Sequence, residues 1–281
     1  MSTKIPNGAR SVITGAGSGF GRAMALDLAA RGARLLLSDI SSTSLEETCA
    51  LARAKGAETS SMIVDVRDAG QVEAMAARAE ELWGGTDVLA NNAGVAVAGA
   101  VGEIPLEDWK WQIDINLMGV IHGCHFFVPK MKAQNRGWIL NVASIAGIVS
   151  APMMGPYNVT KAGVIALSET LATELAPQNI RVTALCPSFF RTNIHQGSRS
   201  TGDLGSRTEK LVTEARWSAE EIAAIAIRGL ECGELYVMPQ PDAKVMWRAK
   251  RALGSRFFGA IGAAAKGGYL ERFFGGDAKA H

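Results

Sequence analysis

Thr14-Gly15-Ala16-Gly17-Ser18-Gly19-Phe20-Gly21 follows the short apolar run Ser11-Val12-Ile13 and leads into a helical pattern over residues 22–31. Glycines between a strand and a helix allow a tight turn and let the backbone approach a pyrophosphate, whose charge the helix N-terminus stabilises. The spacing departs from the literal GxGxxG fingerprint, so a glycine-rich turn that only packs the helix on the strand stays open as an alternative. The segment favours an α/β fold that begins with a nucleotide-binding loop.

The rest of the chain alternates apolar runs with helical patterns. Further buried strands are expected at residues 34–38, 62–64, 87–90, 138–142, 180–185 and 235–238. This alternation is typical of a parallel sheet with helices on both faces. No linker or internal repeat divides it, so we expect one Rossmann-type doubly wound domain of about seven strands over residues 1–241.

Two segments fall outside this regular pattern. Residues 187–216 lack a clear period and are expected to be mostly a functional loop beside the site. Residues 242–281 form a basic, aromatic extension, which we expect to pack on the same domain or on a neighbouring subunit. A basic segment with aromatics can also lie on an anionic membrane surface, but a solvated or subunit-packing helix is the favoured interpretation.

The composition limits the classes of protein to which the chain can belong. Its 281 residues are 48% hydrophobic and 20% charged, and its formal net charge of +2 does not favour nucleic acid as a partner. No stretch approaches the ~20 apolar residues of a membrane span and no signal peptide is recognisable, so we expect a cytoplasmic protein. The dispersed cysteines and histidines lack metal-ligand spacing, which predicts reduced thiols and no metal.

Asp39 ends the second expected strand, beyond the glycine loop. A carboxylate there accepts hydrogen bonds from the ribose hydroxyls of NAD and repels the 2′-phosphate of NADP. Ser18 and Ile40 flank the region without supplying a positive charge, whereas Arg22 and Arg34 are candidate exceptions. A surface carboxylate at a strand end is the alternative, and we expect NAD.

Tyr157 and Lys161 are four residues apart, and Ser144 lies upstream of them. Residues at i and i+4 share one helical face, so the ammonium can lie near the phenol and favour its charged form. The Ser144 hydroxyl could hold a carbonyl or alcohol oxygen beside the phenol, although Ser144 alone could also be a helix or strand cap. The trio predicts acid–base chemistry on a secondary alcohol or ketone.

Taken together, these motifs resemble the short-chain dehydrogenase/reductase family over roughly residues 8–240. Its TGxxxGxG motif is matched at residues 14–21, its NNAG motif at residues 91–94, and its YxxxK motif at Tyr157 and Lys161. Asn116 matches the active-site asparagine and Ser144 the active-site serine. Asn116 alone could instead be a helix-interior residue that bonds to a nearby carbonyl.

The resemblance implies a role for each matched residue. Tyr157 would be the acid/base, Lys161 would lower the pKa of Tyr157 and hold the nicotinamide ribose, Ser144 would position the substrate oxygen, and Asn116 would support a water chain to solvent. Asp65 and Val66 would contact the adenine, and Pro187 and Thr192 the carboxamide. The full set of expected cofactor-binding residues is Thr14, Gly15, Ser18, Gly19, Phe20, Gly21, Asp39, Asp65, Val66, Asn92, Ala93, Gly94, Tyr157, Lys161, Pro187 and Thr192.

Two positions depart from the family pattern. Ser188 stands where the family often has glycine after proline, and the common Asp-Gly-Gly ending is replaced by Pro239-Gln240-Pro241 and the long extension. The family's usual C-terminal interface therefore does not transfer to this chain. The resemblance still implies a homotetramer or homodimer.

The expected substrate end of the site is mainly apolar. We expect substrate contacts from Ser144, Met153, Met154, Tyr157, Phe189 and Phe190. Such a pocket suits a hydrophobic secondary alcohol, which the chain would oxidise to a ketone with NAD. The alternative is a sensor or scaffold protein of the same fold that binds the dinucleotide without turnover. A hydrolase is disfavoured because no GxSxG elbow surrounds Ser144.

Overall fold

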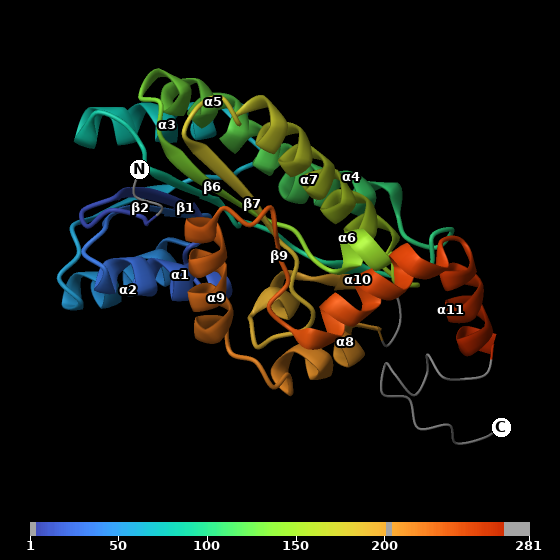
Figure 1. Cartoon of the computed structure of the whole chain (residues 1–281). Coiled ribbons are helices and arrows are strands. Elements are labelled where there is room, and N and C mark those ends of the chain that lie inside the picture. Colours follow the sequence, from blue (N-terminus) through green and yellow to red (C-terminus); the bar gives the residue numbers. More distant parts are fainter. Residues whose placement is uncertain (1–3, 201–203, 267–281) are drawn as a thin grey trace.

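The computed structural model describes residues 4–200 and 204–266, and a parallel sheet forms its centre (Figure 1). The sheet has seven strands in the order β3-β2-β1-β4-β6-β7-β9. These strands are β1 (Arg10–Thr14), β2 (Arg34–Asp39), β3 (Thr59–Ile63), β4 (Val88–Asn91), β6 (Gly137–Val142), β7 (Ile180–Leu185) and β9 (Tyr236–Val237). Because each pair is parallel, all carboxyl ends meet at one edge. The expected doubly wound α/β fold is confirmed.

Helices cover both faces of the sheet, as Figure 1 shows. One layer contains α1 (Gly19–Ala30), α2 (Ser42–Ala54) and α9 (Ala219–Cys232). The other contains α3 (Ala69–Trp83), α5 (Gly119–Ala133) and α7 (Gly155–Glu174). Between β4 and α5 the chain forms α4 (Leu106–Ile113) and a π-helical turn over Asp114–Met118, which runs directly into α5.

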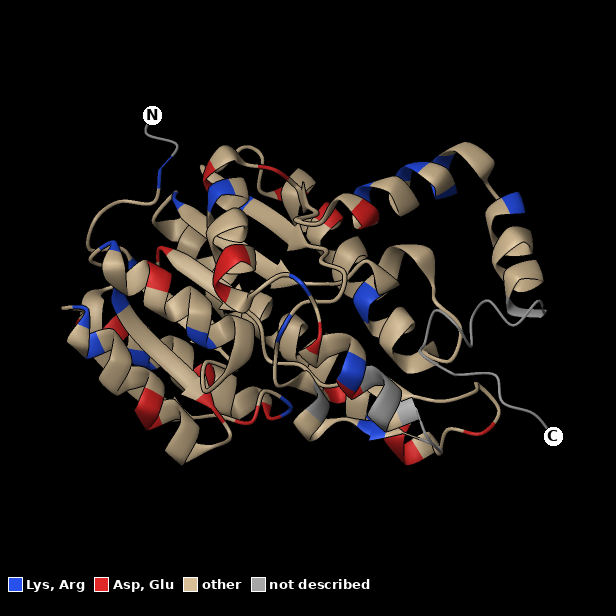
Figure 2. Ribbon diagram, turned by 90° about the horizontal axis from the view of Figure 1, so that it is seen from below, with Lys and Arg blue, Asp and Glu red and all other residues tan. Residues whose placement is uncertain are grey.

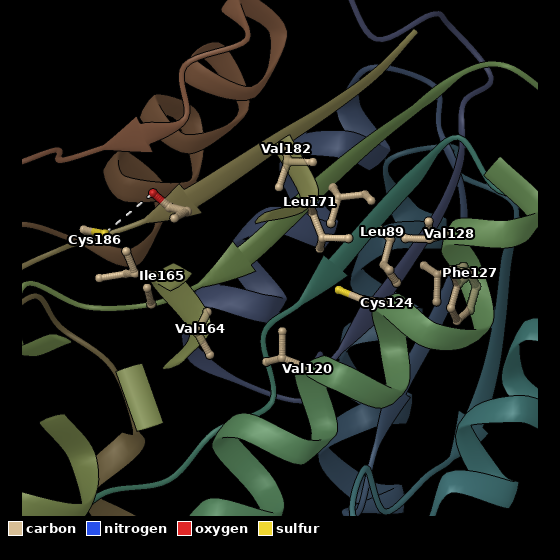
Figure 3. Close-up of a cluster of buried hydrophobic side chains, with 14 of the residues drawn as sticks. Leu89, Val120, Cys124, Phe127, Val128, Val164, Ile165, Leu171, Val182 and Cys186 are labelled. Carbon is tan, nitrogen blue, oxygen red and sulfur yellow. Dashed lines mark hydrogen bonds between the residues drawn. The ribbon is translucent and has the colours of Figure 1, made fainter. Parts of the chain in front are cut away.

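Alternate residues of each strand feed two separate hydrophobic cores. Val12, Leu36 and Leu89 belong to the core on the α3–α5–α7 side, whereas Ile13 and Leu37 belong to the core on the α1–α2–α9 side. Successive side chains of a strand point to opposite faces, so a strand buried on both faces reads as a continuous apolar run. Figure 3 shows the first core, in which the fully buried Phe127 packs near Leu89.

Several elements were not anticipated from the sequence. In the region expected to be mostly loop, the structure has a 3₁₀ turn, Ile194–Gly197, the short strand β8 (Arg199–Ser200), and helix α8 (Leu204–Thr213). β8 pairs with β5 (Val97–Ala98), and α6 (Ala146–Val149) follows β6. β5 and β8 pair although they are distant in sequence, whereas α8 contacts the adjacent 3₁₀ turn and β8.

The described part of the C-terminal extension forms α10 (Pro241–Leu253) and α11 (Arg256–Lys266). Ala243 and Phe257 are buried in the core, so α10 and the start of α11 pack on this domain. Figure 2 shows that the extension carries mostly Lys and Arg among its charged residues. No helix among the described residues has the length and apolarity to cross a membrane.

Asp87 ties together the amino-terminal edge of the sheet, opposite the site. It is 3% exposed, and its carboxylate accepts hydrogen bonds from Arg10 Nε at 2.9 Å and Arg136 Nη2 at 2.5 Å. Burial raises the pKa of Asp87, but the hydrogen bonds from Arg10 and Arg136 outweigh burial and hold the pKa at about 2. The ionised carboxylate therefore stabilises the fold.

We predict that Asp87→Asn lowers the free energy of unfolding at neutral pH by about 1 to 2 kcal/mol, allowing for partial solvent screening. In the wild type this contribution is complete above the unfolded-state pKa and is lost as the pH falls from about 4 towards about 2. Chemical denaturation across this pH range measures both effects.

Glu46→Gln is the matched control, because Glu46 forms an exposed ion pair with Arg53 and should change the stability by less than about 0.5 kcal/mol. Equal stability of the Asp87 and Glu46 variants at neutral pH would contradict the assignment.

Candidate active site

A cavity of about 510 Å³ lies where the carboxyl ends of the central strands meet. In an open α/β sheet this edge is where ligands bind. Among the expected cofactor residues, those that line the cavity are Gly15, Ser18, Gly19, Phe20, Asp39, Asp65, Val66, Asn92, Ala93, Gly94, Tyr157, Lys161, Pro187 and Thr192. Thr14 and Gly21 are buried behind this surface and shape the glycine loop instead.

The glycine loop is packed so closely that side chains would not fit at two positions. A Cβ atom at Gly21 would lie 2.2 Å from the carbonyl oxygen of Gly15. A Cβ atom at Gly17 would lie 2.8 Å from Oδ2 of Asp39. The first contact holds the start of α1 against the loop, and the second leaves the Asp39 carboxylate next to the loop backbone.

Asn92 fastens the glycine loop to the end of β4. Its Nδ2 donates to the carbonyl oxygens of Thr14 at 2.8 Å and Gly15 at 2.9 Å. The Thr14 hydroxyl oxygen in turn accepts from the backbone N–H groups of Asn92 at 3.0 Å and Ala93 at 3.1 Å. Asn92 lines the cavity, and its amide nitrogen donates both of its hydrogen bonds to the glycine loop.

Asp39 lies at the end of β2 with its carboxylate held by the backbone. Oδ2 accepts from the N–H of Gly17 at 2.8 Å and Oδ1 from the N–H of Ser41 at 3.0 Å. Each carboxylate oxygen keeps a further lone pair that can accept from a ribose hydroxyl. The observed position fits the expected role of Asp39.

The two candidate exceptions to an NAD site are both engaged elsewhere. The Arg22 guanidinium donates to the Gly17 carbonyl at 2.5 Å and to Glu47 at 2.9 Å. Arg34 lies at the amino end of β2, away from Asp39, with its guanidinium 5.8 Å from the centre of the Trp83 ring. Arg67, which was not singled out from the sequence, lines the cavity and forms an ion pair with Asp65 at 2.5 Å.

Ser144, Tyr157 and Lys161 converge at the other end of the same cavity. Ser144 is 8% exposed, and its hydroxyl lies close enough to the Tyr157 phenol to lower the pKa of Tyr157. The ammonium of Lys161 donates to the carbonyl oxygen of Val142 at 2.7 Å and lies 5.6 Å from the centre of the Tyr157 ring. The helical spacing of Tyr157 and Lys161 thus places both groups beside the end of β6.

The pKa of Tyr157 is shifted in the direction opposite to the one expected. Burial raises the pKa of Tyr157 to about 12, and the hydrogen bond from Ser144 opposes this shift only in part. Burial also lowers the pKa of Lys161 to about 8. Desolvation disfavours the charged form of each group, and it is the largest cause of both shifts.

Asn116 lies in the π-helical turn and is fully buried. Its side chain pairs with the backbone of Val95 in both directions, donating to the carbonyl and accepting from the N–H at 2.8 Å each. Gly94 separates this amide from the active-site lysine, because a Cβ atom there would lie 3.3 Å from Oδ1 of Asn116 and 3.7 Å from Nζ of Lys161. Asn116 is therefore a neighbour of Lys161, and its role in a water chain stays a prediction.

The substrate end of the cavity is mainly apolar. Met154, Phe189 and Phe190 line it as expected, and Phe190 packs edge-on against Phe20 with ring centres 6.4 Å apart. Met153 does not line it. Its backbone has φ +61°, and the residue is 38% exposed.

Ile194 and Val212 line the cavity from the segment 187–216 that was expected to lie beside the site, whereas Trp111, Ile115, Asp242 and Met246 were missed from the sequence. Met246 belongs to α10, where Ala243, Met246, Trp247 and Lys250 recur at helical spacing and form its less exposed face. That periodicity could have identified a packed helix, but it could not have shown which surface the helix covers. Among the described residues, no cluster of metal-ligating side chains is present.

The chain matches the short chain dehydrogenase family model over residues 10–203. It is 32% identical over 249 residues to the CLA biosynthesis dehydrogenase/reductase of Lactiplantibacillus plantarum, covering 82% of this chain and 87% of that protein. It is 36% identical over 208 residues to a 3-oxoacyl-acyl-carrier-protein reductase of Thermotoga maritima, covering 74% and 79%.

A crystal structure of a short chain dehydrogenase/reductase from Burkholderia phymatum in complex with NAD superposes with a TM-score of 0.84 at 32% identity, covering 90% of this chain and 95% of that one. The chain belongs to the short-chain dehydrogenase/reductase family of oxidoreductases. The family assignment made from the motifs is confirmed.

We predict that Gly21→Ala weakens NADH binding by at least about tenfold, because the methyl group cannot fit against the backbone of Gly15 without displacing the loop. Titration of NADH fluorescence measures the affinity, and circular dichroism checks the fold. Gly102→Ala is the control, since a Cβ atom there meets no atom within 4 Å. Equal affinity of the two variants would refute the role of the loop.

Proposed function

We propose that this protein is an NAD-dependent oxidoreductase that reversibly oxidises a hydrophobic secondary alcohol to a ketone. The observation that carries the proposal is that one cavity contains both the Asp39 carboxylate and the Ser144–Tyr157 pair. In such a cavity, one bound dinucleotide can reach both a carboxylate that binds its ribose and a side chain that transfers a proton.

The residues present fit NAD. The glycine loop leaves the space that side chains would fill, and Asp39 offers carboxylate oxygens without a free cation beside it. Asp65 and Val66 would contact the adenine, Lys161 the nicotinamide ribose, and Pro187 and Thr192 the carboxamide. When bound, the nicotinamide supplies hydride acceptance or donation.

Ser144 and Tyr157 act on the oxygen of the substrate, and Lys161 and Asn116 support them. The Ser144 hydroxyl holds this oxygen beside Tyr157. The Tyr157 phenol gives a proton to the ketone oxygen during reduction, and the Tyr157 phenolate takes the hydroxyl proton of the alcohol during oxidation. The Lys161 ammonium stabilises the phenolate, so it is needed most in the oxidation direction. Asn116 fixes the backbone of Val95 next to Lys161 and supports the return of the proton towards solvent.

The apolar lining around Ser144 supports a hydrophobic substrate. Ile145, Val149, Met154 and Phe189 face the cavity there. A cavity wall of this kind binds an aryl, alicyclic or steroid-like alcohol by excluding water, with the hydroxyl as the main polar anchor. The two relatives described above are named a dehydrogenase/reductase and a reductase, which supports the reaction class.

We predict that a panel of hydrophobic secondary alcohols is oxidised with NAD faster than with NADP, because Asp39 repels a 2′-phosphate. The absorbance of the reduced nicotinamide measures turnover with each cofactor. A preference for NADP would overturn the role given to Asp39. Activity confined to sugars or small polyols would overturn the substrate class.

We predict that Tyr157→Phe abolishes turnover while NADH still binds with its wild-type affinity, because only the proton-transferring hydroxyl is removed. Steady-state kinetics and NADH titration measure the two properties. Tyr236→Phe is the matched control, since Tyr236 donates to Glu169 at the far end of α7 and should keep its turnover. Retained turnover in Tyr157→Phe, or a wild type that binds NADH but turns over no alcohol or ketone, would favour a dinucleotide sensor.

A further inference from the structure

Gln240 is a buried amide outside the family motifs. It follows β9, precedes α10 and is 1% exposed. A buried amide must find partners for both its oxygen and its nitrogen, because an unpaired polar group is costly away from water. Its partners therefore show what it holds in place.

All of the partners of the Gln240 side chain lie in the segment that follows β7. Oε1 accepts from the N–H of Ser188 at 3.0 Å. Nε2 donates to the carbonyl oxygens of Ser188 at 3.4 Å and Phe189 at 3.3 Å. One side chain thus satisfies three backbone groups of a segment that lines the cavity.

The same segment touches the catalytic serine on its other side. The carbonyl oxygen of Pro187 accepts from the N–H of Ile145 at 3.0 Å and from the hydroxyl of Ser144 at 3.5 Å. The Pro187 carbonyl and the Ser188 N–H belong to one planar peptide unit. Gln240 therefore holds one end of a rigid plane whose other end contacts Ser144.

Helix α10, which starts just after Gln240, is anchored to the opposite wall of the cavity as well. The ammonium of Lys250 donates to the carbonyl oxygen of Ile148 in α6. Ala243 is fully buried between these ends, and Met246 lines the cavity. Gln240 thus holds the Pro187–Ser188 peptide from the start of a helix that is also fixed near its other end. The position of this peptide therefore depends on the position of α10.

We propose that Gln240 is a positioning residue that sets the Pro187–Ser188 peptide, and through it the hydroxyl of Ser144 and the wall of the nicotinamide end of the cavity. The proposal rests on the proposed function, because it assumes that NAD occupies this cavity. It also gives a physical role to Ser188: with the peptide held by a side chain, the segment does not need the glycine that the family often has there.

The first test compares two ligands in Gln240→Met, which keeps the size of the side chain and removes its hydrogen bonds. NADH reaches the nicotinamide end of the cavity, whereas ADP-ribose lacks the nicotinamide. We expect the affinity for NADH to fall about tenfold, because three backbone groups lose their partner. The affinity for ADP-ribose should change by less than about twofold, since the adenine end is distant from the change, and kcat should fall as Ser144 loses its orientation.

Gln134→Met is the matched control. Gln134 also joins backbone carbonyls, those of Thr86 and Arg136, but at the amino-terminal edge of the sheet. This variant should lose thermal stability while the ratio of NADH to ADP-ribose affinity stays at the wild-type value. Equal ratios in the Gln240 and Gln134 variants, both folded, would overturn the positioning role.

Gln240→Glu tests the positioning role through the pH dependence of NADH affinity, which a purely structural role of Gln240 would not change. The carboxylate keeps the acceptor for Ser188 but faces two carbonyl oxygens, whereas the protonated acid regains one donor. Burial raises the pKa of such a carboxyl group, so NADH affinity relative to wild type should recover as the pH falls. If the ratio of mutant to wild-type NADH affinity does not change with pH, the proposal is contradicted. Should Gln240→Met fail to fold, the Gln240→Glu result is the deciding test.

These outcomes separate the two proposals. If the wild type binds neither NADH nor ADP-ribose, the proposed function fails. If the wild type binds both and the Gln240 variants leave their ratio and kcat unchanged, only the positioning role fails.

Discussion

The site depends on the hydrogen bonds that join β1 to β4 at the carboxyl edge of the sheet. Asn92 donates to two carbonyls of the glycine loop, and the Thr14 hydroxyl accepts two backbone N–H groups from the segment after β4. These bonds place the loop and the Asn92–Gly94 wall as one unit. Because Asp39 then accepts from the N–H of Gly17, the end of β2 is fixed to the same unit.

This junction explains why motifs distant in sequence form one cavity. Parallel strands bring their carboxyl ends to one edge, but the fold alone does not set the height of each loop above that edge. At the Asp39 end of the cavity, this height is set by the hydrogen bonds between Thr14 and Asn92. At the Ser144 end, it is set by the Pro187 carbonyl, which accepts hydrogen bonds from both Ser144 and Ile145. A small shift in either half would separate the reacting groups, and positioning of this kind is a large part of catalysis.

The elements that follow a local sequence pattern could be predicted from the sequence. Apolar runs predicted the long strands, because strands buried on both faces need continuous hydrophobic residues. Tyr157 and Lys161 were placed together by helical periodicity. Met153 was expected to line the cavity because it is apolar, but apolar character does not show which side of a turn a residue occupies, and Met153 is partly exposed. The cavity wall formed by α10 was missed because its partner surface, α6, is far away in sequence.

The pKa shifts of Tyr157 and Lys161 could not be predicted from the sequence. They matter for the proposed proton transfer between Tyr157 and the substrate. Spacing showed that an ammonium could lie near the phenol, but burial of both groups decides the sign of the Tyr157 shift. Burial raises the pKa of Tyr157 and lowers that of Lys161, so it disfavours both the phenolate and the ammonium.

A protonated phenol is ready to donate to a ketone, so reduction starts from the resting state of the side chains. Oxidation requires that Tyr157 first lose its proton, and the Ser144 hydrogen bond and the Lys161 charge are the groups that reduce this cost. Both favour the phenolate. These two groups therefore affect how readily Tyr157 accepts a proton, whereas the net direction of a reversible reaction is set by the concentrations of alcohol, ketone and the two cofactor forms.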